Sequence, residues 1–504
     1  ESTRIGSRRG TSSHQYNPGV ILAGKNTNED SGSCYGMLFV YSGNFLVEAE
    51  KDQYDQTRIQ MGLTDELFAY PLEAGAEFTA PEVILSYTNK GLSRLSQQYH
   101  HCIMNHICQG KYVHANRPVL INSWEAFYFD FDAPKLLGLA DAAADLGMEL
   151  FVLDDGWFGK RNDGTSSLGD WYPNEEKLKG TLKELAEKIN AKGLKFGLWI
   201  EPEMTNKDSD LYRAHPDWLL AEQGKRICHS RNQYVLDFSK KEVREYIGDM
   251  LENLLAEVPV SYIKWDLNRT FSEVFSNGND REYQGKVCHK YILGVYELYE
   301  RLTSRFPHVL FESCASGGAR FDPGMLYYAP QGWTSDDTDA IERLKIQYGT
   351  SMVYPVSCMG SHVSASPNHQ TNRVTPIETR ADVAYFGTFG YELDLLKLDE
   401  EDKVEIRRQI AFMKEKRDLI QKGTFYRLKS PFEGNETAWM IVSEDQKKAL
   451  VGYYRVMQPV NVGFKRLKLK GLKEDICYKV SGYDYDCYGC LLYTSPSPRD
   501  LSTS

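Results

Sequence analysis

The stretch SYIKWDLNR, residues 261–269, decides the fold. Its apolar and aromatic residues predict a buried β-strand at Tyr262–Leu267, which ends in a lysine, a tryptophan and an aspartate. Similar short strands recur along the chain with charged segments between them: Val119–Tyr128, Glu149–Gly156, Lys195–Glu201, Tyr234–Phe238, Val309–Ser313, Gln331–Thr334 and a looser one at Met352–Met359. Strand and helix repeated about eight times predict an α/β fold with a central (β/α)8 TIM barrel.

The charged segments between the strands predict amphipathic helices that cover the barrel. The clearest are Glu175–Lys192, Lys241–Glu257, Arg281–Arg305 and Asp339–Tyr348. We therefore expect the barrel to occupy residues 119–422.

The N-terminal flank alternates polar and apolar residues, which is typical of antiparallel sheet; Gly36–Phe45 and Phe68–Ile84 are clear cases. Because Arg4–His14 has no evident strand partner, we interpret residues 1–88 as the remnant of an N-terminal β-sandwich. The chain begins without a methionine or a signal peptide, and we expect part of this domain to lie upstream. Residues 89–118 predict a connecting helix.

The C-terminal flank returns to the alternating pattern. Residues 423–490 predict a small C-terminal β-sandwich with strands at Trp439–Val442 and Lys448–Tyr454. The Ser- and Pro-rich residues 491–504 resemble a non-native extension, which we expect to be disordered.

Composition narrows the class of protein. The chain has 504 residues and a formal net charge of −11, which argues against nucleic acid but not against neutral sugars. No apolar run approaches the ~20 residues that a membrane-spanning helix needs. The ten cysteines lack a framework spacing, so we expect reduced thiols and a cytoplasmic protein. Cys487 and Cys490 form a CxxC pair without a second pair at zinc spacing, so no metal is expected.

Carboxylates and tryptophans gather at the carboxyl ends of the predicted strands, where barrel enzymes carry their sites. The clusters are Asn122–Glu125, Asp154–Trp157, Trp199–Glu201, Lys264–Asp266, Glu312–Cys314 and Trp333–Asp337. Burying such groups without a ligand is costly, so we predict a ligand-binding mouth. Charged groups bind hydroxyls and tryptophan faces stack on sugar rings, which favours a carbohydrate.

Two aspartates have the surroundings that glycoside cleavage requires, namely one ionised and one protonated carboxyl. Lys264 and Arg269 flank Asp266, and neighbouring cations lower the pKa of a carboxylate and keep it ionised, as a nucleophile should be. Asp336 lies among further aspartates, where one carboxyl can keep its proton near neutral pH, as a general acid must.

Structural roles for the same residues stay open at this point. Asp266 could form an ion pair, Asp154–Asp155 a solvated turn, and the tryptophans ordinary parts of the core. The helix after Asp336 needs an N-cap, which we assign to Asp337 or Asp339. Cys314 is expected to be a reduced packing residue.

At these motifs the chain resembles the α-galactosidases of glycoside hydrolase family 36. Their nucleophile motif KWDxNR stands at residues 264–269, and their acid/base motif stands at residues 333–339 as WTSDDTD. Further similar motifs follow in order along the barrel: NSWEAFYFDF (122–131), LDDGWFGKRNDG (153–164), GLWIEPEM (197–204), HPDWLL (215–220), RNQYVLDFS (231–239), ESCASGGARFDPG (312–324) and SHVSASPNHQTNR (361–373).

The resemblance implies residue roles. Asp266 would attack the anomeric carbon, and Asp336 would protonate the leaving oxygen and later activate water. Asp154 and Asp155 would hold the hydroxyls of a galactose ring. The other substrate contacts that it implies are Trp124, Trp199, Arg231, Lys264, Asn268, Cys314, Ser316, Gly317 and Trp333. Ala315 and Ser316 interrupt a loop that is more glycine-rich in many family members, which bears on the fit at the sugar's 2-position.

The resemblance predicts hydrolysis of terminal α-galactosides of the melibiose and raffinose type, with retention and without any cofactor. Retention requires the two aspartates to lie about 5–5.5 Å apart. The alternatives are galactosyl transfer as in raffinose or stachyose synthases, α-N-acetylgalactosaminidase activity, and an inactive carbohydrate-binding fragment. A metal-dependent hydrolase would need a His-x-His pair, which the sequence lacks. The expected partners are a small oligosaccharide and, because family members are often tetramers, further copies of the chain; neither nucleic acid nor a membrane is expected.

Overall fold

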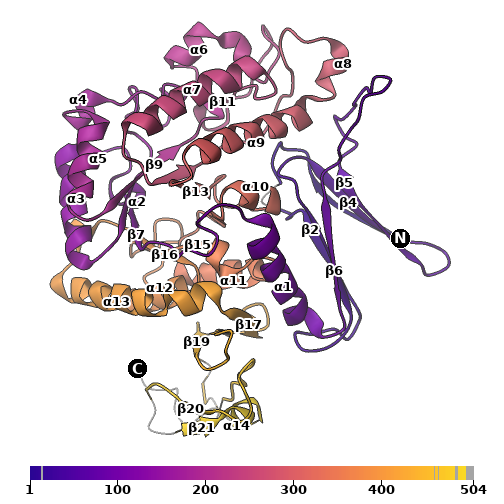
Figure 1. Cartoon of the computed structure of the whole chain (residues 1–504), viewed down its shortest axis with the longest axis vertical. Helices are drawn as coiled ribbons and strands as arrows, with labels where there is room; N and C mark the ends of the chain where they lie inside the picture. Colours follow the sequence, from indigo (N-terminus) through magenta and orange to yellow (C-terminus); the bar gives the residue numbers. More distant parts are fainter. Residues whose placement is uncertain (13–14, 459, 462, 464, 483–485, 495–504) are drawn as a thin grey trace.

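The computed structural model describes residues 1–12, 15–458, 460–461, 463, 465–482 and 486–494. A central barrel carries the N-terminal strands along one side and the last strands at one end (Figure 1). Within the described residues, no helix combines the length and the apolar character needed to cross a membrane.

Eight parallel strands form the barrel, in the order β14-β13-β12-β9-β8-β7-β16-β15. A parallel bridge between Gly332 and Met359 links the two end strands, so the sheet closes. The bounds are β7 (Leu120–Asn122), β8 (Leu150–Leu153), β9 (Lys195–Ile200), β12 (Tyr262–Trp265), β13 (Leu310–Ser313), β14 (Gln331–Gly332), β15 (Gly360–Ser364) and β16 (Thr388–Glu392). The predicted α/β class and TIM-like barrel are confirmed.

Apolar side chains fill the barrel at the end where its strands begin. Leu120, Leu150, Val152, Tyr262 and Leu310 form one buried cluster contributed by four strands. Burying each such side chain contributes about 1.5–3 kcal/mol, which fixes the strands from this end. The opposite ends of the strands are thereby left to carry polar side chains.

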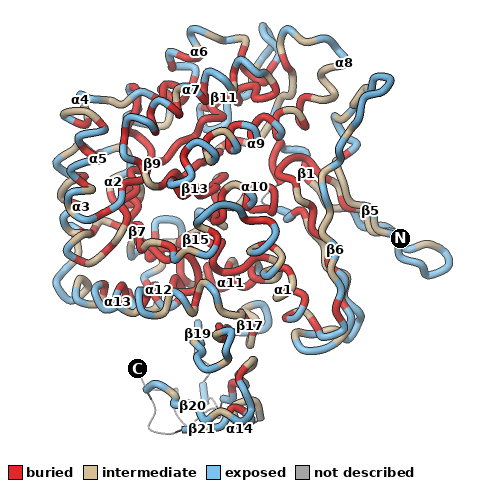
Figure 2. The backbone as a smooth tube through the Cα atoms, viewed as in Figure 1, coloured by how far each residue is buried: buried red, intermediate tan, exposed pale blue. Residues whose placement is uncertain are grey.

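Helices cover the outside of the barrel, and buried and exposed residues alternate along them (Figure 2). In α3, Asp132 accepts a hydrogen bond from the Lys135 N–H as N-cap, and Gly147 ends the helix in the left-handed conformation. The helices of the barrel region are α2 (Trp124–Phe127), α3 (Ala133–Leu146), α4 (Glu175–Leu178), α5 (Leu182–Asn190), α6 (Asp210–Ala214), α7 (Lys241–Glu257), α8 (Arg281–Gln284), α9 (Val287–Arg305), α10 (Pro323–Tyr328), α11 (Ala340–Thr350), α12 (Ile377–Ala384) and α13 (Glu400–Lys422). Among them, α8 has no buried residue.

Two of the predicted barrel strands are wrong. The stretch 234–238 does not join the barrel, because β11 (Gln233–Val235) pairs antiparallel with β10 (Met204–Asn206). The stretch 352–359 contains a 3-10 helix, Val356–Cys358, and the strand of that region is β15. The remaining strand, β16, was not predicted.

The predicted helices are present, although two of them are each divided into two helices. The predicted bounds of α7 are confirmed. The single helix predicted over residues 175–192 divides into α4 and α5, because Lys179 adopts a left-handed conformation and Thr181 starts α5 with a capping box to Glu184. The helix predicted over residues 281–305 likewise divides into α8 and α9.

The N-terminal region forms two three-stranded antiparallel sheets. One has the order β1-β4-β5, and the other β2-β3-β6. Their bounds are β1 (Ser2–Ser7), β2 (Gly19–Ala23), β3 (Cys34–Phe39), β4 (Phe45–Lys51), β5 (Thr57–Leu63) and β6 (Val83–Thr88). The expectation that residues 4–14 lack a partner is wrong, because β1 pairs with β4 from Ser2 to Ser7. The strand expected over residues 68–84 begins only at Val83.

The connecting segment and the C-terminal region complete the chain. The connecting helix is α1 (Gly91–Cys102), continued by a π-helical turn at Ile103–Ile107. The C-terminal elements are β17 (Thr424–Lys429), β18 (Glu436–Val442), β19 (Ala449–Arg455), β20 (Cys477–Lys479), β21 (Asp486–Tyr488) and α14 (Gly489–Thr494). The disorder expected from residue 491 is wrong for the end of α14, and residues 495–504 lie outside the described residues.

A buried ion pair fastens two of the loops at the open end of the barrel. Arg320, in the loop after β13, donates to both carboxylate oxygens of Glu203, in the loop after β9, at 2.9 and 2.7 Å. Glu203 also accepts from the Trp265 indole at 3.0 Å and from the Tyr291 hydroxyl at 2.7 Å. Both charged side chains are fully buried, so each depends on the other.

Arg320→Met should lower the free energy of unfolding by about 3–5 kcal/mol, because Glu203 would be left as an uncompensated buried charge. Urea denaturation followed by tryptophan fluorescence measures this loss. Arg213→Ala is the control, since Arg213 forms exposed ion pairs with Asp208 and Asp210, and its loss should be much smaller because solvent screens exposed pairs. Equal losses in the two variants would contradict the assignment.

Candidate active site

The predicted site residues come together from two halves of the barrel. On one side, β9, β12 and β13 are neighbours and carry Trp199, Asp266 and the loop that begins at Cys314. On the other side, the loop after β14 carries Asp336, and β15, β16 and β7 follow in the barrel order. β8, which precedes Asp154, lies between β9 and β7.

Asp266 follows β12 and is buried among hydrogen-bond donors. Its Oδ2 accepts from the Trp199 indole Nε1 at 3.1 Å and from Asn268 Nδ2 at 2.7 Å. Its Oδ1 accepts from the backbone N–H of Leu267 at 2.8 Å and of Ser316 at 3.2 Å. These donors favour the ionised form of the carboxyl.

The charge balance around Asp266 keeps it ionised. Burial by itself would raise the pKa of Asp266, but the charge of Lys264 and hydrogen bonds from Cys314 and the donors just described outweigh burial and lower that pKa. Arg269 does not take the role expected for it, because its guanidinium turns to Gln233 O and to Glu273. The sequence neighbour that supports the charge of Asp266 is therefore Lys264.

Lys264 itself is held by Asp154. Its Nζ lies 3.0 Å from Asp154 Oδ2, and both side chains are buried. Asn122 Nδ2 donates to the same oxygen at 2.7 Å. Burial opposes the charge of Lys264, but Asp154 and then Glu392 outweigh burial and raise the pKa of Lys264 well above its ordinary value. Lysine and aspartate thus form a charged floor beside Asp266.

The side chain of Asn268 has a fixed orientation. Its Oδ1 accepts from Arg231 Nη1 at 2.8 Å and from Ser316 Oγ at 3.0 Å. With the carbonyl oxygen occupied by two donors, the amide NH2 faces Asp266. Arg231 and Ser316 both have left-handed backbones, with φ of 57° and 43°, a strain that tends to occur at functional sites.

Two glycines allow the loops after β13 and β14 to touch. A Cβ at Gly317, where φ is +79°, would lie 2.7 Å from the backbone nitrogen of Asp336. A Cβ at Gly318 would lie 2.4 Å from the carbonyl oxygen of Thr334. Because Ser316 donates to Asp266 and Gly317 contacts Asp336, one loop adjoins both aspartates.

The pKa of Asp336 is shifted in the opposite direction to that of Asp266. It is exposed, yet the surrounding walls remove enough water that burial, followed by the charge of Asp266, raises the pKa of Asp336 to about 6. Glu392 adds to this rise, whereas Lys264 and Arg231 oppose it. One carboxyl of the pair is therefore ionised while its neighbour keeps a proton into weakly acidic solution.

Asp339 is the N-cap of α11. Its Oδ1 accepts from the backbone N–H of Ile341 at 2.8 Å and of Glu342 at 3.2 Å, which confirms the assignment of the cap to Asp337 or Asp339. Asp337 Oδ1 accepts from the Asp339 N–H at 3.0 Å. Asp336 is left without a capping role.

Asp155 is tied to a buried arginine. Arg161 Nε and Nη2 donate to its two oxygens at 2.6 and 2.7 Å. Burial raises the pKa of Asp155 even though Arg161 opposes that rise. Since Asp154 and Asp155 are both buried, the alternative of a solvated turn is wrong.

The three predicted tryptophans have different surroundings. Trp199 is buried and donates to Asp266. Trp333 is also buried and packs on His362, with ring centroids 4.6 Å apart. Trp124 is half-buried and meets Tyr128 edge-on at 5.1 Å. Of the three, Trp124 therefore keeps the most surface for a ligand.

Cys314 behaves as a protonated thiol. Burial, and then the charges of Asp266 and Asp336, raise the pKa of Cys314 well above its ordinary value. A protonated thiol donates a hydrogen bond but is a poor nucleophile, in agreement with the packing role expected for it. Cys314 is one of nine cysteines, all but Cys490, that are free thiols in the described part of the chain.

Two buried glutamates at strand ends were missed as site residues. Glu201 Oε1 accepts from the Asn268 N–H and Oε2 from Gln233 Nε2, and burial followed by the charge of Asp266 raises the pKa of Glu201 to about 8. Glu392 Oε2 lies 3.0 Å from His362 Nδ1. Glu201 stood at a predicted strand end, and this position was a usable signal; Glu392 lies on the strand that was not predicted.

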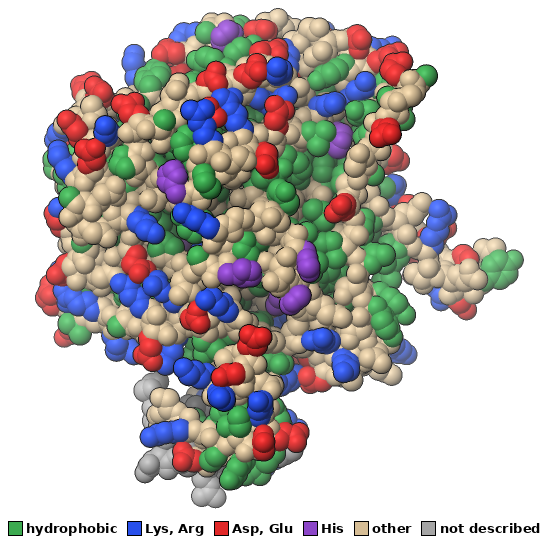
Figure 3. Space-filling view, viewed as in Figure 1, with side chains coloured by type: hydrophobic (Ala, Val, Ile, Leu, Met, Phe, Trp, Pro, Cys, Tyr) green, Lys and Arg blue, Asp and Glu red, His purple; other side chains and the backbone are tan. Residues whose placement is uncertain are grey.

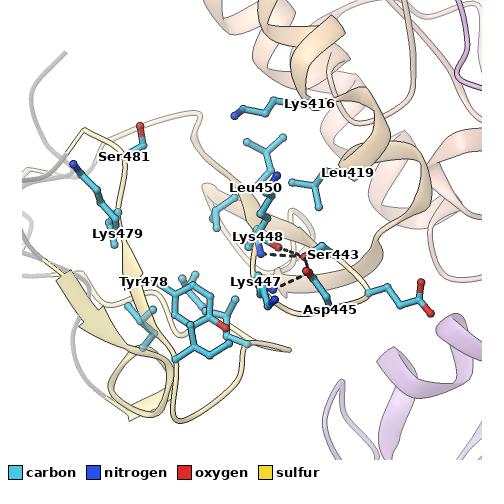
Figure 4. A pocket seen from close by; sticks show the side chains of 18 of the residues that line it. Lys416, Leu419, Ser443, Asp445, Lys447, Lys448, Leu450, Tyr478, Lys479 and Ser481 are labelled. Atoms are coloured by element: carbon cyan, nitrogen blue, oxygen red, sulfur yellow. Dashed lines mark hydrogen bonds between the residues drawn. The ribbon is translucent and has the colours of Figure 1, made fainter.

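Other features of the surface carry no comparable arrangement. A hollow of about 1500 Å³ lies between α13 and the C-terminal strands, lined by residues such as Lys416, Leu419, Lys448 and Lys479 (Figure 4). It contains none of the predicted site residues. Acidic and basic side chains are interspersed over the face seen in Figure 3. In the described part of the chain, no three His, Cys, Asp or Glu side chains are grouped to hold a metal ion.

Three family models and the solved structures that resemble this chain point to the same family. The Melibiase family matches residues 77–423, the glycosyl hydrolase family 36 N-terminal domain residues 2–73, and the glycosyl hydrolase family 36 C-terminal domain residues 436–495. The crystal structure of α-galactosidase AgaA from Geobacillus stearothermophilus superposes with a TM-score of 0.98 at 50% identity, over 100% of this chain and 70% of that chain.

Curated relatives are longer than this chain. The AgaA sequence is 52% identical over 94% of this chain and 65% of its own length. The bifunctional α-galactosidase/sucrose kinase AgaSK from Mediterraneibacter gnavus is 58% identical over 95% of this chain and 51% of its own length. The chain thus spans between about half and two thirds of these relatives.

Gly317→Ala should destabilise the protein by about 1–2 kcal/mol and displace the Asp336 loop, because the new Cβ meets backbone and the left-handed φ is retained. Thermal unfolding measures the loss. Gly434→Ala is the matched control, since nothing lies within 4 Å of its Cβ position. Unfolding temperatures that fall equally in both variants would show that the contact with Asp336 is not the cause.

Proposed function

Because this chain belongs to glycosyl hydrolase family 36, we propose that it hydrolyses terminal α-D-galactosyl residues from melibiose- and raffinose-type oligosaccharides with net retention. The observation that carries this proposal is the pair of neighbouring aspartates with opposite pKa shifts, downward for Asp266 and upward to about 6 for Asp336. Glycoside hydrolysis requires one carboxyl in each state.

In the first step, a carboxylate oxygen of Asp266 attacks the anomeric carbon while the carboxyl of Asp336 gives its proton to the glycosidic oxygen. The bond between the anomeric carbon and this oxygen breaks, and the leaving sugar departs as an alcohol. In the second step, Asp336 takes a proton from water, and the water oxygen attacks the anomeric carbon. The ester to Asp266 breaks, which restores both groups and retains the configuration.

Retention requires the two carboxyl groups to lie about 5–5.5 Å apart. The loop that contacts both aspartates, through Ser316 and Gly317, supports such proximity. The solved complexes of AgaA with raffinose and with stachyose each carry a replaced aspartate, and the two replaced positions are 70 residues apart. Asp266 and Asp336 have the same separation in sequence.

The sugar ring would lie on the charged floor beside Asp266. Lys264 and Asp154 offer a donor and an acceptor to the hydroxyls of galactose, including axial O4. Asp155, held by Arg161, supports this floor. The remaining assignments are Trp199, Arg231, Asn268, Cys314, Ser316 and Gly317 to the ring and its 2-position, and Trp124 and Trp333 to the pocket wall.

The proposal also covers the cellular compartment and the oligomeric state of the protein. The nine free thiols other than Cys490 in the described residues favour a reducing compartment such as the cytoplasm. We propose a homo-oligomer in solution, following the family resemblance, with a small oligosaccharide as the other partner.

Asp266→Gly should lower turnover of p-nitrophenyl α-galactoside by about 10⁴-fold or more, because no covalent intermediate can form. Azide should restore part of this turnover by entering the vacated space and should yield β-galactosyl azide, which chromatography and NMR identify. Wild-type turnover in this variant, or an α-configured azide, would end the assignment.

Asp336→Asn should slow melibiose strongly while sparing α-galactosides whose leaving groups need no proton. The ratio of kcat/KM between 2,4-dinitrophenyl α-galactoside and melibiose measures this difference and should rise at least about 100-fold. Asp337→Asn is the matched control and should leave the ratio unchanged, because Asp337 accepts from the Asp339 N–H within its own turn. A rise of the same size in the control would remove Asp336 from its role.

The kcat/KM of the protein should fall as pH rises above about 6, because Asp336 must be protonated in the first step. Glu392→Gln removes a negative charge that raises the pKa of Asp336, so the basic limb should move to lower pH. A pH profile on p-nitrophenyl α-galactoside measures the shift. Glu400→Gln, on the outer helix α13, should leave the limb in place. A limb that moves to higher pH in Glu392→Gln would refute the charge assignment.

A further inference from the structure

We propose that Tyr128 and His369 form the subsite for the leaving group, holding a neutral hexose beside the cleaved bond on the Asp336 side of the barrel. This inference rests on the proposed hydrolysis and deepens it. Both residues lie within quoted motifs, at 122–131 and 361–373, but neither is among the substrate contacts that the family resemblance implies.

Tyr128 is an exposed aromatic residue on a strained backbone. It ends α2 with φ of 50° and ψ of −122°, and 41% of its surface is accessible. A non-glycine residue in this conformation is costly and persists where surrounding contacts over-determine it, often at ligand sites. Its hydroxyl lies 2.5 Å from His369 Nδ1, and its ring meets half-buried Trp124 at 5.1 Å. The three rings make an aromatic rim.

The rim is fastened to the acid/base loop. Thr338, two residues after Asp336, donates to Glu125 Oε1 at 3.1 Å, next in sequence to Trp124. Asn368, next to His369, donates to Thr338 Oγ1 at 3.0 Å. The loops after β7 and β15 therefore meet at the residue that follows the Asp336 turn.

A buried glutamate, Glu125, lies beside this rim. The Glu125 side chain is only 4% exposed, and burial followed by the charge of Glu392 raises the pKa of Glu125 to about 8, against hydrogen bonds from Thr338, Ala365 and Gln370. The oxygen that approaches His369 is Oε2. This oxygen lies 3.8 Å from His369 Nδ1, too far for a direct hydrogen bond. Glu125 therefore does not occupy the imidazole of His369, which is 34% exposed and can meet a ligand hydroxyl.

The order of the strands sets which side the leaving group occupies. Asp266 attacks from the half formed by β9, β12 and β13, and Asp336 must reach the glycosidic oxygen from the half formed by β14, β15, β16 and β7. The leaving group must lie on the acid side, where the rim stands. Ring faces of Tyr128 and Trp124 suit the C–H face of a hexose, and the imidazole of His369 suits a hydroxyl.

The test compares a substrate that fills the subsite with one that cannot. Melibiose presents a glucose leaving group, whereas α-galactosyl fluoride presents only fluoride. Tyr128→Gly removes the ring and suits the left-handed backbone, and His369→Ala removes the imidazole. Each should lower kcat/KM for melibiose by about tenfold and change that for α-galactosyl fluoride by less than about twofold. Tyr327→Ala, also at a tyrosine that is 41% exposed, is the matched control and should affect neither substrate.

A second measurement follows galactosyl transfer, in which a sugar enters the leaving-group subsite as the acceptor. With α-galactosyl fluoride as donor and glucose as acceptor, transfer to glucose requires the same subsite, so the ratio of transfer to hydrolysis should fall in Tyr128→Gly and His369→Ala. This ratio does not depend on how much protein is folded.

Three outcomes would overturn the proposal or its premise. Equal losses on both substrates with an unchanged transfer ratio would make the pair a structural support, and unchanged kinetics on melibiose would place the leaving group elsewhere. If the unsubstituted protein hydrolyses neither melibiose nor α-galactosyl fluoride, the proposed function itself fails.

Discussion

The site depends on one buried ion pair, Lys264 with Asp154. The open end of the barrel gathers more carboxylates than cations, and most of them are buried. Lys264, 3.0 Å from Asp154, is the charge that overcomes the burial of Asp266 and lowers its pKa. Without this ammonium, the desolvation cost would push Asp266 toward its neutral form. Together with the hydrogen bonds that Asp266 accepts, Lys264 keeps Asp266 ionised, whereas burial and the charge of Asp266 raise the pKa of Asp336.

Each half of the site has its own positioning network, and glycines join the two. On the nucleophile side, Asn268 is held by Arg231 and Ser316 so that its amide faces Asp266. On the acid side, Thr338 ties together the loops after β7, β14 and β15. Besides the approach of Gly318 to Thr334, the close approach at Gly317 is a direct contact between these halves. A side chain at that position would separate the very groups that must act on one carbon.

The sequence predicts the barrel strands that are apolar runs. It does not predict strands of mixed polarity, and it does not show which strands pair with which. β12 and β9 are apolar runs that end in charged residues, so their place in the barrel was evident. β15 reads GSHVS and β16 reads TFGYE, and neither has the apolar run of a typical barrel strand, so one was displaced and the other missed. The stretch around Tyr234 has such a run but pairs antiparallel outside the barrel, which local pattern cannot distinguish.

The sequence predicts a raised pKa for Asp336, but the structure gives a different cause for it. The neighbouring aspartates were thought to hold its proton in place, but Asp339 caps α11 and pairs with Arg373, so its charge is already compensated. Burial, Asp266 and Glu392 raise the pKa instead, and these come from strands far apart in the sequence. The sequence neighbours of a carboxyl therefore indicate a candidate catalytic residue. Its protonation state depends on groups that are distant in sequence and that the closed barrel brings near it.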